Sequence, residues 1–88
     1  MYLHIGQSVV VPEANIIGIF DLDNTTGSQI TRKFLGNAEK SGRVISVSEE
    51  LPKSFVVCGE ADPTKMKIYL SQLSSHTLMK RSEAMRFE

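Results

Sequence analysis

The segment from Thr26 to Gly42 constrains the fold most, because it carries the most complete helix pattern in the sequence. Thr26 and Gln29 have the spacing of a capping box, in which two side chains bond backbone N–H groups at the start of a helix. Apolar residues then recur every three or four positions, namely Ile30, Phe34, Leu35 and Ala38. Glycine commonly ends a helix, as Gly42 would here. The pattern predicts a helix over 27–41 with one apolar face.

Short apolar runs on both sides of this helix have the length and composition of β-strands. The expected strands cover residues 2–5, 8–12, 15–22, 43–48, 54–58 and 66–70. Gly6-Gln7 is a plausible tight turn between the first two strands. The loop GEADPTK (59–65) contains Asp62-Pro63, a turn signal, so the last two strands should form a hairpin.

A second helix is expected at the C-terminus, where Ser74 or Ser75 would cap it and where the chain would fray from about residue 82. The predicted order is three strands, a helix, three strands and a helix. This order indicates an α+β domain, with a small, mostly antiparallel sheet, one central helix and a short C-terminal helix. We expect residues 1–88 to form this single domain.

The size of the domain favours association with copies of itself. A chain of 88 residues hides only about 60–65% of the surface that its unfolded form exposes, so its own core is small. We expect strands such as 9–11 and 55–57 to leave apolar surface and open sheet edges, which invite pairing.

Charge and hydropathy limit the kinds of partner that this chain can bind. Ten basic and ten acidic side chains leave no net charge, so no overall field attracts nucleic acid or an anionic membrane. The longest apolar run, 16–20, is far shorter than the roughly 20 residues that cross a bilayer. The N-terminal MYLHIGQ lacks the pattern of a signal peptide, and a lone cysteine fits a reducing compartment. We therefore expect a soluble, cytoplasmic protein that does not bind membranes.

The sequence IIGIFDLDNTT (16–26) resembles the nucleophile strand of haloacid-dehalogenase-like phosphatases, with Asp21-x-Asp23-x-Thr25. Those enzymes have a doubly wound parallel sheet that needs several crossovers of a dozen or more residues, and only one such unit is visible here. The later carboxylate pair that would hold magnesium is missing from the sequence. Aspartate at a strand end or near a helix start also has ordinary structural reasons. We expect this pair to be structural.

No other residues form a catalytic pattern. The two histidines, His4 and His76, lie at opposite ends of the chain, and we expect both to be solvent-accessible. Cys58 lies in an apolar strand, where a buried, inert thiol is the usual outcome. No glycine-rich phosphate loop and no Gly-x-Ser-x-Gly motif occurs. We therefore expect no enzyme activity, no cofactor, no metal and no small-molecule substrate.

The basic residues are the remaining candidates for a function. Arg32 and Lys33 should lie on the outer face of the central helix, and Lys53 in a turn. Acidic residues are interleaved with them, so composition alone favours a mixed, solvated surface.

Read as a whole, the chain resembles the Rem family of bacterial extracellular-matrix regulators and looks closest to the RemB-like branch. The order and spacing of several segments carry this resemblance across nearly the whole length. The matching segments are MYLHIG (1–6), VVVP (9–12), IIGIFDLDNTT (16–26), TRKFL (31–35), LPKSFV (51–56) and IYLSQLSSHTLMKR (68–81).

The resemblance implies a homo-oligomeric transcription regulator of biofilm-matrix genes. In the RemA-like branch, subunits form a ring whose surface arginines bind DNA. The arginine pair in the loop before residues 55–58 is replaced here by Leu51 and Pro52, and a further basic position by Asn15. Arg32 and Lys33, by contrast, fall where that branch has basic helix residues.

We therefore predict a homo-oligomer, preferably a ring, that binds double-stranded DNA. Arg32, Lys33 and Lys53 are the expected contacts, mainly to backbone phosphates. The alternative is an oligomeric partner protein that modulates a DNA-binding relative without touching DNA itself.

Overall fold

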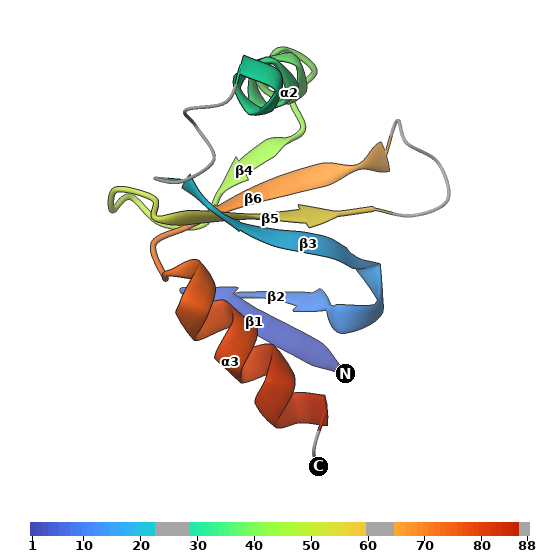
Figure 1. The fold of residues 1–88 in the computed structure, drawn as a ribbon, viewed down its shortest axis with the longest axis vertical. Coiled ribbons are helices and arrows are strands. Elements are labelled where there is room, and N and C mark those ends of the chain that lie inside the picture. The colour runs from blue at the N-terminus through green and yellow to red at the C-terminus, as the bar shows by residue number, and fades with distance from the viewer. Residues whose placement is uncertain (23–28, 60–64, 87–88) are drawn as a thin grey trace.

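The structure of the chain is a computed structural model, in which residues 1–22, 29–59 and 65–86 are described, the last four of these by their backbone only. Figure 1 shows the arrangement of the elements. The helices and strands are β1 (Tyr2–Gly6), β2 (Val9–Pro12), the 3₁₀ helix η1 (Glu13–Asn15), β3 (Ile16–Asp21), α2 (Gln29–Lys40), β4 (Val44–Ser46), β5 (Ser54–Cys58), β6 (Lys67–Ser71) and α3 (Ser75–Arg86).

The domain has three layers around a four-stranded sheet with the strand order β3-β5-β6-β4. Helix α2 covers one face of the sheet, and the β1-β2 hairpin lies with α3 on the other (Figure 1). Strand β5 pairs antiparallel with β3 and β6, whereas β4 pairs parallel with β6. The predicted element order and the mostly antiparallel α+β class are confirmed, including the hairpin of β5 and β6.

Strand β5 is the centre of the core, because all five of its residues are buried. Phe55 and Val57 pack with Ala38 on the α2 side. Val56 and Cys58 pack on the other side with residues of the hairpin and α3. The expectation of open apolar surface at 55–57 is wrong, since a strand with a partner on each side has no free edge.

One end of each helix has an identifiable cap. Gly42 has φ +70°, its N–H donates to the Glu39 carbonyl at 3.0 Å, and the Arg43 N–H donates to the Ala38 carbonyl at 2.9 Å. This pair of bonds is a Schellman motif, which satisfies the last carbonyls of α2 and confirms Gly42 as its stop. Ser74 is the N-cap of α3, because it precedes the helix and its Oγ accepts the Thr77 N–H at 3.1 Å.

Two further sequence expectations concern α2, namely its N-cap and its apolar face. Thr26, the expected N-cap, lies outside the described residues. The apolar face of the helix is only half covered. Ala38 is buried and Leu35 is half-buried, but Ile30 is 81% exposed and Phe34 is exposed as well.

Candidate nucleic-acid interface

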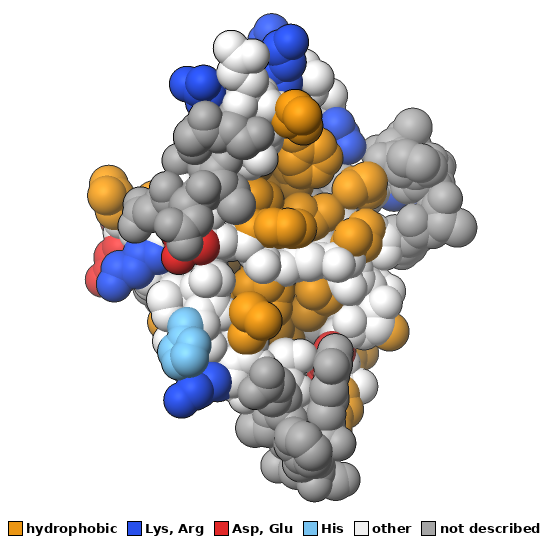
Figure 2. All heavy atoms as spheres, in the orientation of Figure 1, with side chains coloured by type: hydrophobic (Ala, Val, Ile, Leu, Met, Phe, Trp, Pro, Cys, Tyr) orange, Lys and Arg blue, Asp and Glu red, His pale blue; other side chains and the backbone are white. Residues whose placement is uncertain are grey.

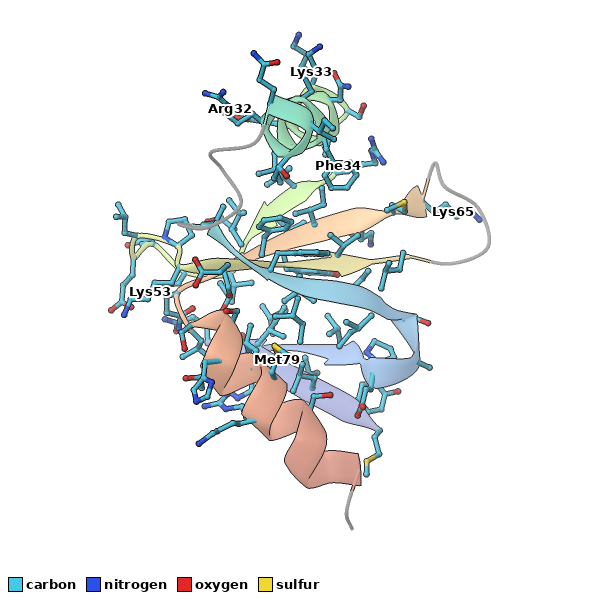
Figure 3. All side chains as sticks on the ribbon, in the orientation of Figure 1. Arg32, Lys33, Phe34, Lys53, Lys65 and Met79 are labelled. Carbon is cyan, nitrogen blue, oxygen red and sulfur yellow. The ribbon has the colours of Figure 1, made fainter. Side chains whose placement is uncertain are left out.

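Arg32 and Lys33 lie on the outer face of α2, as predicted, and both side chains are exposed. Figure 3 shows Lys33 projecting from the helix on the side away from the sheet, and Arg32 projecting sideways from it. Among the described residues, neither side chain forms an ion pair or a hydrogen bond. Their charges are therefore not neutralised by that part of the protein.

Lys53 ends the loop between β4 and β5, and its backbone is held on both sides. Its N–H donates to the Ser71 carbonyl at 2.8 Å, and its own carbonyl accepts the Leu22 N–H at 3.0 Å. The side chain is exposed and has no partner among the described residues. A cation on a fixed backbone is well suited to contact a ligand outside the protein, because only the side chain has to be ordered.

The three predicted residues come from two elements. In the view of Figure 3, Arg32 and Lys53 lie toward the same edge of the molecule, whereas Lys33 extends from the far side of α2. The surroundings of Lys53 are of mixed charge, because Glu49 and Glu50 are exposed in the same loop. The expected mixed surface is thus present around Lys53.

The structure also describes the positions at which the sequence departs from the RemA-like branch. Leu51 is 87% exposed at the tip of the loop before β5, and Pro52 beside it is half-buried. Asn15 ends η1, and its carbonyl accepts the Gly59 N–H at 2.9 Å. An arginine at the position of Leu51 would be free to reach solvent, so the fold itself does not prevent a basic side chain there.

The sequence analysis missed a second group of cations at the opposite end of the sheet. Lys65 and Lys67 line a hollow of about 410 Å³ together with Asn15 and Tyr69, and Figure 3 shows Lys65 far from Lys53. The strand register brings these residues together, since Cys58 pairs with Lys67. Predicting this cluster from the sequence would have required the pairing register of β5 and β6.

The residues considered for catalysis lie apart. His4 and His76 are exposed, and the His4 Nε2 contacts the Gln7 carbonyl. Asp21 ends β3, while Asp23 and Thr25 lie outside the described residues. Within the described ranges, no three His, Cys, Asp or Glu side chains are placed to hold a metal ion.

Cys58 is buried, as expected of an inert thiol. Burial raises the pKa of its thiol from 9.0 to about 11, because the thiolate would lose its hydration. The pKa of Tyr69 is also raised, first by burial and second by the charge of Cys58. In the described parts of the chain, neither helix is long and apolar enough to cross a membrane.

The small α+β fold, and the order in which the sequence segments from MYLHIG to IYLSQLSSHTLMKR follow one another, fit a bacterial extracellular-matrix regulator, and comparison with known proteins supports this class. Residues 2–81 match the model of the RemA-like family, described as extracellular matrix regulatory protein A-like, and the chain belongs to this family. It is 39% identical over 85 residues to extracellular matrix regulatory protein B of Bacillus subtilis (strain 168), a match that covers 97% of this chain and 94% of that protein.

Proposed function

We propose that this member of the extracellular matrix regulatory family is a cytoplasmic homo-oligomer that regulates transcription of biofilm-matrix genes by binding double-stranded DNA. The observation that carries the proposal is that Arg32, Lys33 and Lys53 are exposed and have no partner among the described residues. Such cations neutralise backbone phosphates and release counterions from the duplex.

Oligomerisation matters to this function because a monomer has no net charge with which to attract DNA. A ring repeats each local group of cations along one circular surface, so several phosphates are contacted at once. Within the described residues, no helix presents an evident set of base-reading side chains beside Arg32 and Lys33. Contacts to the phosphate backbone and to DNA shape therefore dominate the proposed mode.

A gel-shift titration at two salt concentrations tests the proposal, with the molar mass of the same sample measured by light scattering. We expect binding at low salt that is nearly independent of sequence and much weaker near physiological salt. Each neutralised phosphate should contribute about −0.9 to the slope of log affinity against log salt. An oligomer that gives no shift even at low ionic strength contradicts DNA binding.

The second candidate function is that of an oligomeric partner protein that modulates a DNA-binding relative without contacting DNA. The exposed apolar Leu51 favours this alternative, because the resemblance to the RemA-like branch implies an arginine at this place in the loop. A mixed sample with the DNA-binding relative would then show a changed affinity, while the protein alone shows none.

Under both proposals the protein is not an enzyme and takes no cofactor or small-molecule substrate. Asp21 then has a structural role at the end of β3. The purified protein should not hydrolyse a generic phosphate ester with magnesium present. Hydrolysis that disappears in Asp21→Asn, with the fold intact, would show that the protein is a phosphatase.

A further inference from the structure

Exposed apolar side chains lie on both sides of the sheet edge at β3. Above this strand, a groove of about 310 Å³ lies between α2 and the sheet. Its lining has one polar residue and no charged one, and consists of Ile17, Phe20, Ile30, Thr31, Phe34, Phe55, Val57 and Met66. Figure 2 shows hydrophobic side chains gathered on one face of the molecule.

A second hollow lies below β3, between this strand and α3. Met79 lines it together with Ile17, which also lines the groove, whereas Glu13 and Ser82 make this second hollow more polar. Figure 3 shows Phe34 and Met79 on opposite sides of β3. Exposed apolar side chains therefore lie on both sides of β3, with Ile17 lining both hollows.

The strand between the two hollows has a free edge. Of the described strands, only β5 pairs with β3, and the Ile16–Asp21 sequence has no proline or lysine to discourage further pairing. At the other edge of the sheet, β4 has only three residues. A short edge strand is itself protective, so the six-residue β3 is the edge open to a partner.

We propose that this β3 face, defined by Ile17, Phe20, Ile30, Phe34 and Met79, is the surface through which copies of this chain associate. The inference rests on the homo-oligomer proposed above and adds the place of contact. Phe20 forms the floor of the face, because its ring stacks on Phe55 with the centroids 5.0 Å apart. A rigid aromatic floor gives contact area with little loss of side-chain freedom.

The size of the face fits a second copy. At about 200 Å² for a fully exposed large side chain, the five exposed fractions correspond to on the order of 500 Å² of surface. A standard interface buries about 800 Å² on each partner, of which about 60%, or about 480 Å², is apolar. The face therefore supplies the apolar area that one stable protein–protein contact requires, and copies without net charge do not repel each other.

Two substitutions test the face without disturbing the core. Ile30→Glu changes a side chain that is 81% exposed in the first turn of α2, where a carboxylate suits the helix dipole. Ile17→Lys places a charge on the edge strand, which blocks pairing. Val10→Lys is the matched control, since Val10 is an exposed strand residue of the β1-β2 hairpin on the other side of the sheet.

Light scattering and analytical ultracentrifugation at micromolar concentration give the readout, with circular dichroism to verify folding. We expect an oligomer for wild type and Val10→Lys, and a shift of both face variants toward the 9.8 kDa monomer, with apparent dissociation constants raised at least about tenfold. If folded Ile30→Glu and Ile17→Lys keep the wild-type mass, or if Val10→Lys dissociates to the same extent, the assignment of the face is overturned. A monomeric wild type would instead refute the proposed homo-oligomer, and a different partner would then cover this face.

Discussion

The Ser71 hydroxyl donates a hydrogen bond to the Ile5 carbonyl at 2.6 Å and so joins two strands that lie 66 residues apart in the chain. The same oxygen accepts the Leu73 N–H at 3.1 Å, and the side chain is fully buried. One hydroxyl thus connects the four-stranded sheet, the β1-β2 hairpin and the segment that leads into α3. Because buried polar groups are costly when unpaired, this serine should matter to stability.

We expect Ser71→Ala to lower the free energy of unfolding by about 1–3 kcal/mol, because the Ile5 carbonyl and the Leu73 N–H lose their buried partner. Chemical denaturation at a fixed protein concentration measures the change. Ser41→Ala is the control, since the Ser41 hydroxyl donates to the Asn37 carbonyl on the exposed surface. The control should change stability by no more than about 0.5 kcal/mol, and equal effects of the two substitutions would contradict the role of Ser71.

The two glycines of the α2 region should respond to alanine with opposite signs. Gly42 has φ +70°, where a side chain strains the backbone, so Gly42→Ala should destabilise the fold by about 1 kcal/mol. Gly36 lies inside α2 with open space where a Cβ would be placed, so Gly36→Ala should stabilise the fold by up to about 1 kcal/mol. Thermal melts of both variants check the signs. A stabilising Gly42→Ala would exclude the Schellman cap.

The sequence correctly predicted the helix stop at Gly42 but wrongly predicted open apolar surface at 55–57, and both outcomes have physical causes. Helix α2 and its stop were predictable because capping and helical periodicity are local in the sequence. The place of β5 in the sheet was not, because an apolar run of five residues fits an edge strand and a central strand equally well. Its burial depends on β3 and β6, which are its partners in the tertiary structure.

Some features of the candidate sites were likewise predictable from the sequence, and others were not. The exposure of Arg32 and Lys33 followed from the helical period, and the cap at Ser74 from its side-chain type. The exposure of Ile30 did not, because periodicity predicts which residues share a face but not what covers that face. The β3 face depends on the incomplete cover that α2 gives the sheet, which leaves the groove open.

Cys58 should react slowly with thiol reagents in the folded protein. Its pKa of about 11 leaves almost no thiolate near neutral pH, and the side chain is buried. Alkylation by iodoacetamide at pH 8 should therefore be much slower in the folded protein than in denaturant. Equal rates in the two states would show that the thiol is accessible.

The same pKa gives a pH dependence of stability with a definite sign. The folded-state pKa of Cys58 lies above the value of the unfolded chain, so the unfolded state loses the proton first as pH rises. The contribution of this group to stability is complete below about pH 9 and declines as the pH approaches 11. Cys58→Ala should reduce this alkaline loss of stability, and an unchanged profile would assign the loss to other groups such as Tyr69.

Lys53 should contribute to DNA affinity without contributing sequence preference. Under the proposed function, Lys53→Ala removes one phosphate contact per subunit in the bound region. Each lost contact should flatten the slope of log affinity against log salt by about 0.9, and affinities for unrelated duplexes should fall by the same factor. Arg32→Glu should act in the same direction while α2 stays folded, because Arg32 is exposed on its outer face.

Lys65→Ala is the matched control for this last prediction, since Lys65 is an exposed lysine at the opposite end of the sheet from Lys53 (Figure 3). Fluorescence anisotropy with a labelled duplex measures the DNA affinity of all three variants at several salt concentrations. The molar mass of each sample is verified first. We expect the slope to change for Lys53→Ala and Arg32→Glu and to stay near the wild-type value for Lys65→Ala. If Lys65→Ala alone changes the slope, DNA contacts the other end of the sheet, where Lys67 and Asn15 line the same hollow. The interface predicted at Arg32, Lys33 and Lys53 would then be wrong, although the protein would still be a DNA-binding regulator.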